Sequence, residues 1–154
     1  MYRLEYHQII PVSLEKAWDF FSSPKNLNEI TPPDLSFQIL SPESDIQQMY
    51  EGQVILYKIQ PFPLVKMNWV TEITHVKNLS FFIDEQRFGP YKFWHHQHHF
   101  MEKNGQVEMK DILHYDLNFG FLGSLANSIV VKKKIQGIFE YRKKKIDELF
   151  KLIN

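Results

Sequence analysis

Alternation of apolar and polar side chains is the dominant pattern along the chain, and it predicts mostly antiparallel β structure. Successive side chains of a strand point to opposite faces, so a strand with one buried face has an apolar residue at every second position. The clearest case is 106–118, where Val107, Met109, Leu113 and Tyr115 alternate with mostly polar residues. On this criterion we expect strands at residues 2–10, 35–41, 52–60, 64–76, 79–88, 91–102 and 106–118.

Residues 81–101 are the most unusual stretch, and we interpret them as a β-hairpin that turns at Gly89-Pro90. Glycine adopts the dihedral angles of a turn, and proline lacks the N–H group that a position inside a sheet needs. The parity of the second strand places four side chains on one face: Trp94, His96, His98 and Phe100. Because two aromatic residues bracket the two histidines, we assign this face to the interior.

The other residues of the hairpin follow from the same parity. His95 and His99 fall on the opposite face, which we expect to be exposed. On the first strand, Asp84 and Gln86 are expected to point inward beside the buried histidines. A shift of one residue in the register of the turn would reverse this assignment.

Asn104-Gly105 is the strongest local turn signal, and it brings strand 106–118 back beside strand 91–102. Asp111 then lies on the apolar face of its strand. A buried carboxylate is costly unless it is paired or hydrogen-bonded. We therefore expect His96 and His98 of the adjoining strand to be its partners.

Two short helices are expected between the first two strands. Ser13 is a suitable N-cap for the first, whose apolar residues fall on one helical face. In the second, the Ser23 hydroxyl is expected to cap the helix before Pro24 at the first helical position, and Thr31-Pro32-Pro33 ends it.

A long helical region follows Gly120, and its apolar stripe changes phase. Leu122, Leu125, Ala126 and Ile129 lie on one side of a helix, whereas Val131, Ile135, Ile138, Ile146, Leu149 and Ile153 lie nearly opposite. We therefore expect a short helix, a break near Ser128 to Val131, and a long helix to about Leu152. Arg142 lies within the second stripe, where its guanidinium must either extend to solvent or meet an acid such as Asp84 or Asp111.

The order of elements predicts an α+β protein in which a curved antiparallel sheet of about seven strands wraps around a long C-terminal helix. An antiparallel sheet with one apolar face and a helix with one apolar stripe bury those surfaces against each other. Inward aromatic residues curl the sheet around the helix: Trp69, Trp94, Phe100 and Tyr115. If the helix does not fill the concave side, a cavity with a few polar groups is left.

Composition agrees with one folded domain over residues 1–154, with 44% hydrophobic and 23% charged residues. Cysteine is absent, which excludes a disulfide scaffold and a thiolate metal site. No apolar run reaches the roughly 18 residues of a transmembrane helix, and we expect a cytoplasmic protein. The segment 121–154 carries eight basic and three acidic residues. We interpret these lysines as a solvated helix face, because no nucleic-acid-binding motif accompanies them.

Several motifs together resemble the START-like, or SRPBCC, superfamily, in its bacterial branch labelled polyketide cyclase/dehydrase-like or ligand-binding. The motifs are Phe82-Ile83-Asp84-Glu85-Gln86, Gly89-Pro90-Tyr91, the run from Trp94 to Phe100, Asp111-Ile112-Leu113-His114-Tyr115 and Ile138-Phe139-Glu140-Tyr141-Arg142. The resemblance covers essentially the whole chain. It implies the helix-grip fold, also seen in birch-pollen-allergen-like (Bet v 1-like) proteins, with a hydrophobic pocket between sheet and helix. Members bind lipids, sterols or polyketides, and only some are enzymes.

Three hypotheses remain for the inward polar groups. They can form a satisfied buried network, they can anchor a mostly apolar ligand, or His96, His98 and Asp111 can act as an acid–base set in a cyclase- or isomerase-type enzyme. The same three residues match a two-histidine, one-carboxylate metal set, but no motif supports this, and we expect neither a metal nor a cofactor. The expected partner is a small hydrophobic molecule, with these ligand-binding candidates: Trp69, Asp84, Gln86, Trp94, His96, His98, Phe100, Asp111, Tyr115 and Arg142.

Overall fold

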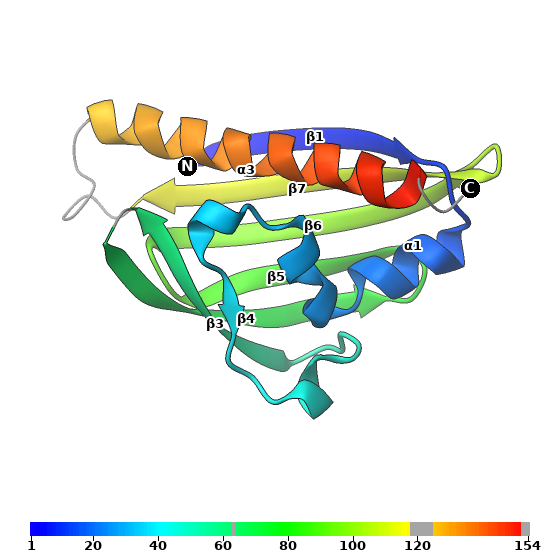
Figure 1. Cartoon of the computed structure of the whole chain (residues 1–154), viewed down its shortest axis with the longest axis horizontal. Helices are drawn as coiled ribbons and strands as arrows, with labels where there is room; N and C mark the ends of the chain where they lie inside the picture. Colours follow the sequence, from blue (N-terminus) through cyan, green and yellow to red (C-terminus); the bar gives the residue numbers. More distant parts are fainter. Residues whose placement is uncertain (63, 118–124, 152–154) are drawn as a thin grey trace.

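The computed structural model describes residues 1–62, 64–117 and 125–151, and it places helices on the concave side of a curved sheet (Figure 1). Along the chain the elements are β1 (Tyr2–Ile10), α1 (Leu14–Phe21), the 3-10 helices η1 (Pro24–Ile30) and η2 (Pro33–Leu35), β2 (Gln38–Ile39), the 3-10 helix η3 (Glu43–Ile46), β3 (Gln53–Phe62), β4 (Val65–Lys77), β5 (Phe81–Phe88), β6 (Tyr91–Lys103), β7 (Gln106–Leu117) and α3 (Leu125–Lys151). None of the helices in these ranges combines the length and apolar character needed to cross a membrane.

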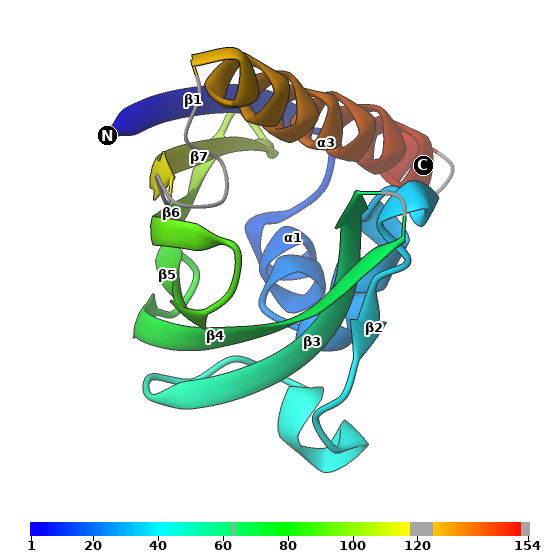
Figure 2. The same cartoon turned by 90° about the vertical axis from the view of Figure 1, so that its left-hand side faces the viewer.

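The seven strands form one antiparallel sheet in the order β1-β7-β6-β5-β4-β3-β2, which confirms the expected α+β architecture. Register shifts between β4 and β5, at Val70–Thr71 and at Ile73–His75, mark irregularities of the bulge type. Bulges bend a strand and increase its local twist. Figure 2 shows the sheet curving from β1 and β7 through β6 and β5 to β4 and β3.

The turn between β6 and β7 is the one that Asn104-Gly105 predicts. Both residues are left-handed, with φ of 55° and 75°, and Lys103 pairs with Gln106 across the two-residue turn. The preceding turn contains Gly89, where a Cβ would collide with the side chain of Gln86. Glycine is therefore required there for space.

The two expected helix starts have different outcomes. Ser13 caps α1 as predicted, with its Oγ accepting a hydrogen bond from the backbone N of Lys16 at 3.3 Å. The second helix is a 3-10 helix, η1, and the prediction that Ser23 caps it is wrong. The Ser23 hydroxyl instead donates to the backbone oxygen of Gln47 at 2.6 Å, because the segment around η3 folds back against it.

The expected strand 35–41 is mostly not a strand. Leu35 belongs to η2, and Ser36 is left-handed with φ of 44°, which reverses the chain direction. Gln38 and Ile39 pair with β3, and the backbone N of Leu40 adds a hydrogen bond to the backbone oxygen of Leu56 at 2.8 Å. The apolar alternation of this segment was thus a poor guide, since Leu35 is buried from a helical turn rather than from a strand.

The predicted break in the C-terminal helical region is wrong within the described residues, because α3 is continuous from Leu125 to Lys151. The expected short helix before Leu125 lies outside the described residues. The second apolar stripe is the buried one, with Val131, Ile135 and Ile146 at most 4% exposed. Ile129 and Val130 remain 54% and 52% exposed, so the helix continues with these apolar side chains unburied instead of breaking to bury them.

The core has separate parts along the concave face, and the cavity lies between them. One part joins α3 to β7, through Val131, Ile135 and Phe139 against Leu113 and Tyr115. Another joins α1 and the end of α3 to β5, β6 and β7, and a third packs β3 against β4. The inner polar side chains of β5 and β6 lie among these clusters.

Candidate functional site

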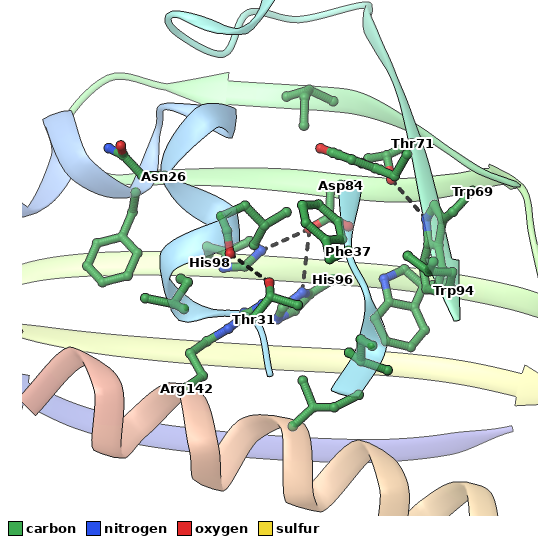
Figure 3. A pocket seen from close by; sticks show the side chains of 18 of the residues that line it. Asn26, Thr31, Phe37, Trp69, Thr71, Asp84, Trp94, His96, His98 and Arg142 are labelled. Carbon is green, nitrogen blue, oxygen red and sulfur yellow. Dashed lines mark hydrogen bonds and ion pairs between the residues drawn. The ribbon is translucent and has the colours of Figure 1, made fainter. Parts of the chain in front are cut away.

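A cavity of about 180 Å³ lies on the concave side of the sheet, between the sheet, η1 and α3. Its wall is mainly apolar and aromatic, with a small group of polar side chains (Figure 3). Six of the ten predicted ligand-binding residues line it: Trp69, Asp84, Trp94, His96, His98 and Arg142. Trp69 and Trp94 meet edge to face with ring centroids 5.1 Å apart.

The other four candidates lie outside the lining that the described residues form. Gln86 is used by its own hairpin, because its Nε2 donates to the backbone oxygen of Tyr91 at 2.7 Å and its Oε1 accepts from the backbone N of Tyr91 at 3.2 Å. Phe100 packs edge to face on Trp18, and Tyr115 is covered on one side by Tyr2. Strand parity found the inward face correctly but could not tell which inward positions are covered.

Asp111 is on β7 and also lies outside the cavity lining. It contacts both buried histidines of β6, His96 and His98. The register pairs His98 with Asp111 across β6 and β7, and Asp84 with His96 across β5 and β6. The Nε2 of His96 lies 3.1 Å from Asp111 Oδ1. The Nδ1 of His98 lies 2.8 Å from the same oxygen, as an ion-pair contact too poorly aligned for a hydrogen bond.

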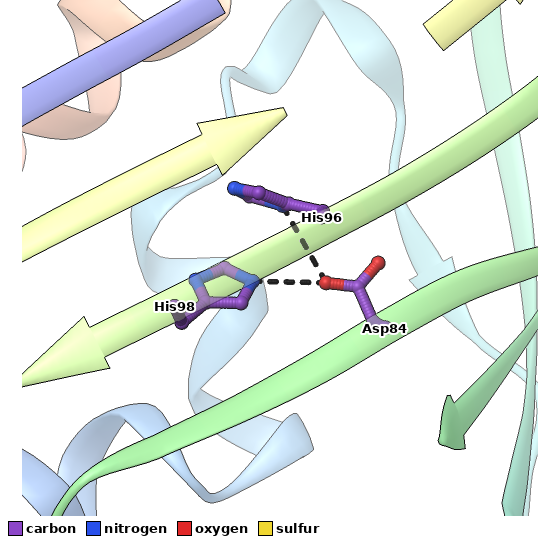
Figure 4. A group of neighbouring side chains, drawn as sticks. All are labelled: Asp84, His96 and His98. Carbon is purple, nitrogen blue, oxygen red and sulfur yellow. Dashed lines mark hydrogen bonds and ion pairs between the residues drawn. The ribbon is translucent and has the colours of Figure 1, made fainter. Parts of the chain in front are cut away.

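Asp84 contacts the same two histidines from the other side. Its Oδ2 lies 2.9 Å from His98 Nε2 and 3.4 Å from His96 Nδ1 (Figure 4). The four side chains thus close a ring in which each histidine lies between the two carboxylates. His96 and His98 are 4% and 7% exposed, which confirms the prediction that this pair is buried.

The prediction that His95 and His99 are exposed is wrong in degree. Both are on the outer face, but both are half-buried. His95 Nδ1 lies 2.7 Å from Glu85 Oε1, and His99 Nε2 lies 3.0 Å from Gln97 Oε1. Long neighbouring side chains on the outer face cover part of each ring.

The four side chains of this ring change one another's pKa values, and they do so in different directions. Burial raises the pKa of both carboxyl groups, but hydrogen bonds and positive charge from the histidines outweigh it and hold the pKa of Asp84 and of Asp111 below the ordinary value. Burial, followed by the charge of His98, lowers the pKa of His96. Burial opposes charge on His98 too, but the two carboxylates together raise its pKa. Within the ring, the two carboxylates therefore favour the charged form of His98, whereas burial and the charge of His98 favour the neutral form of His96.

Asp84, His96 and His98 could also hold a divalent metal ion, since one ligand atom from each lies within 4.8 Å of the others. Two histidines and a carboxylate suit iron or zinc. The nitrogens that such an ion would use are those facing Asp84. A metal would therefore have to replace the contacts between Asp84 and the two rings.

Arg142 reaches into the cavity from α3 (Figure 3). The predicted ion pair is absent, because Arg142 contacts neither Asp84, Asp111 nor any other described acid as an ion pair; the side chain is half-buried, and its Nε is buried without a hydrogen-bond partner. Its guanidinium carbon lies 5.4 Å from the ring centroid of Phe139. Its positive charge contributes to the lowered pKa of Asp84, after the larger effects of burial and of the histidines.

Sequence reasoning did not identify several lining residues. Tyr57 and Thr71 lie on β3 and β4, and Thr71 accepts a hydrogen bond from Trp69 Nε1 at 3.0 Å. Strand parity could have found Thr71, which is two positions from Trp69 and shares its face. Asn26 and Thr31 come from η1 and its end, and no pattern in the sequence indicated that this segment covers the sheet.

Comparisons with known proteins show the fold. No family model matches the chain, and a search of curated proteins found no match. Among solved structures, protein Ms6760 from Mycobacterium smegmatis matches with a TM-score of 0.71 and 16% identity over 99% of this chain and 92% of that one. Protein CV1439 from Chromobacterium violaceum matches with a TM-score of 0.70 and 10% identity, over 96% of each chain.

A further structure, Ara h 8.0201, matches with a TM-score of 0.62 and 13% identity over 94% of this chain and 97% of that one. These matches cover nearly the whole of each chain, while the identities are too low to indicate more than shared architecture. The chain therefore has the Bet v 1-like helix-grip fold of the SRPBCC type, as its resemblance to the START-like superfamily implied.

Proposed function

We propose that this protein binds a small, mainly apolar molecule in the cavity between the sheet and α3. The observation that supports this is the cavity itself, which has a mostly apolar and aromatic wall and a few polar groups gathered on it. Ligand sites commonly combine an apolar wall, which supplies affinity, with a few polar groups that fix orientation. Trp69 and Trp94 supply flat apolar surface. The polar part comes from Asp84, His96 and His98, the three members of the buried ring that line the cavity.

The volume favours a small ligand. A protein cavity of roughly 150 Å³ accommodates benzene, and this one measures about 180 Å³. A molecule with a single ring, or with a medium-length chain, fits this space better than a sterol does. Within the range of lipid-, sterol- and polyketide-like ligands, we therefore favour the smaller and simpler molecules.

The test is native mass spectrometry of the protein as purified, followed by identification of any molecule that it retains. A matched pair of variants ties retention to the cavity. Thr71→Phe adds a ring on the cavity face of β4, whereas Thr74→Phe makes the same change on the half-buried opposite face. We expect Thr71→Phe to lose the molecule and Thr74→Phe to keep it.

Thermal melting of both variants completes this experiment, because overpacking commonly costs about 1–3 kcal/mol. A folded Thr71→Phe protein that retains the same molecule would contradict binding in this cavity. So would wild-type protein that retains nothing and also fails to bind small apolar probes, as followed by the fluorescence of Trp69 and Trp94.

A second candidate function is acid–base catalysis on the bound molecule. The observation that favours it is that the pKa of His96 is lowered whereas the pKa of His98 is raised. Two neighbouring titratable groups with opposite pKa shifts can supply a base and an acid. His96 lines the cavity and is the candidate base; its Nε2 lies 3.1 Å from Asp111 Oδ1, and its Nδ1 lies 3.4 Å from Asp84 Oδ2. Asp111→Asn should then lower turnover of the identified molecule by roughly 10²- to 10⁴-fold while binding persists. Undiminished turnover by the folded variant would exclude this role.

A further inference from the structure

The positive charge of Arg142 has no partner among the described residues, although the side chain lines a largely apolar cavity. It forms no hydrogen bond and no ion pair with any of them, and its Nε is buried. The side chain as a whole is half-buried, and Nε is its buried donor without a partner; leaving even one buried donor of a charged group unpaired is costly. Such an unpaired group calls for an explanation, and a missing ligand is one.

The nearby acids do not take this role. Asp84 directs its Oδ2 at His98 and His96, and Asp111 directs its Oδ1 at the same two rings. Both carboxylates are thus held by histidines on the sheet. Arg142 approaches from α3, and its guanidinium carbon lies 5.4 Å from the ring centroid of Phe139.

The neutral polar groups near η1 also have internal partners. The Asn26 amide donates to the backbone oxygen of Phe20 at 3.0 Å, and the Thr31 hydroxyl donates to the backbone oxygen of Leu27 at 2.6 Å. They add polar surface without competing for an acidic group. Among the described lining residues, Arg142 is thus the permanently charged donor left for a ligand.

We propose that Arg142 receives the carboxylate of a small amphipathic acid whose apolar part lies against the aromatic wall. This inference rests on the proposed binding function and names the chemical class of the ligand. The planar fork of a guanidinium matches the two oxygens of a carboxylate, and such bonds are strengthened by charge. One negative charge on the ligand matches the single unpaired arginine. A phosphate would bring additional negative charge toward Asp84, which disfavours it.

The cavity volume limits the apolar part of this acid. At about 180 Å³, the space suits a medium-length alkyl chain or a single aromatic ring. Octanoic acid and octan-1-ol are therefore the probes. They share their chain length and differ in the charge of the head group, so the difference between their affinities reports on Arg142.

Isothermal titration calorimetry at pH 7.5 measures both affinities in the wild type and three variants. Arg142→Met keeps the apolar stem without the charge, and Arg142→Lys keeps the charge without the planar fork. Arg87→Met is the matched control, since Arg87 is on β5 outside the cavity lining and pairs with Glu72 and Glu85. We expect the wild type and Arg87→Met to bind octanoic acid roughly ten- to hundred-fold more tightly than octan-1-ol.

Arg142→Met should lose this preference while still binding octan-1-ol, and Arg142→Lys should keep only part of it. The ligand-free Arg142→Met protein should melt close to the wild type, because the guanidinium forms no hydrogen bond or ion pair with the described residues and loses only its contact with Phe139 and a weak attraction to Asp84. A merely structural arginine would instead lower the melting temperature and leave the preference intact.

The outcomes separate this inference from the proposed function. Equal binding of acid and alcohol by the wild type, or an acid preference that survives Arg142→Met, would overturn the role of Arg142 and leave the binding function standing. If neither probe binds the wild type, both the acid class and the binding of chain-like molecules in this cavity fall.

Discussion

Replacing Asp111 with asparagine tests the buried ring, because the substitution keeps the shape and removes one negative charge. Asp111 Oδ1 is the atom that both histidines approach, at 3.1 Å from His96 and 2.8 Å from His98. An amide oxygen can take this position, so an acceptor remains while the charge that stabilises protonated His98 is lost. Removing one partner of a buried ion pair costs about 3–5 kcal/mol. Because one acceptor survives, we expect about 1–3 kcal/mol.

The loss of folding stability caused by Asp111→Asn should depend on pH. The titration of His98 decides at which pH the loss is larger. Its pKa is raised in the folded protein. The stability that this group contributes is therefore fully present below its unfolded pKa of about 6.5 and is lost as the pH rises through the folded pKa. Asp111→Asn removes much of the cause of this shift. The variant should thus be destabilised more at pH 6 than at pH 9.

Thermal and urea unfolding at the two pH values measure this effect. For a chain of this size, about 1–3 kcal/mol corresponds to a melting temperature lower by roughly 2–12 °C at pH 6. Asp19→Asn is the control, because Asp19 is exposed on α1, and a surface change of this kind is usually within about 0.5 kcal/mol. An equal loss at both pH values, or a larger loss at pH 9, would refute a protonated His98 held by Asp111.

Three further predictions concern other parts of the fold. In urea unfolding, Ile135→Ala should cost about 2–5 kcal/mol of stability and Ile129→Ala less than about 0.5 kcal/mol. The reason is that the Ile135 side chain is 1% exposed and the Ile129 side chain 54% exposed. Similar losses in the two variants would contradict the buried stripe of α3. Gln86→Leu should cost about 1–3 kcal/mol of stability, because the backbone N and O of Tyr91 both lose their partner. The affinity for octan-1-ol should stay unchanged. Weakened binding would show that Gln86 belongs to the binding site. The folded pKa values of Asp84 and Asp111 are lowered, so the stability that these carboxylates contribute is present above pH of about 4 and is lost as the pH falls further. The melting temperature should therefore fall as the pH drops below about 4, and a flat profile there would count against the ring.

Period-2 alternation predicted the long strands well because each has one face against the core and one against solvent. It also placed His96, His98, Asp84 and Asp111 on the inner face before any register was known. Asn104-Gly105 fixed the pairing of β6 with β7, since a two-residue turn allows one register. The buried ring is therefore largely a consequence of local sequence.

Local sequence failed where burial comes from segments distant along the chain. The hydroxyl of Ser23 has the right position to accept a hydrogen bond as a helix cap, but it instead donates to the backbone oxygen of Gln47 and makes no cap bond. The phase change at Ile129 suggested a break, yet nothing forces a helix to bury every apolar side chain. The helix α3 keeps its backbone hydrogen bonds at Ile129, and the side chain of Ile129 stays exposed.

By itself, the sequence determined the strands, the long helix and the identity of the inward polar residues, because these depend on side-chain periodicity and on turn chemistry. The tertiary structure decided which inward residues reach the cavity. Gln86 turned to its own hairpin and Phe100 was covered by Trp18, whereas Arg142 was left facing the cavity without an acid. These outcomes depend on where α1, η1 and α3 settle on the curved sheet, and packing between distant elements is not encoded in any one segment's pattern.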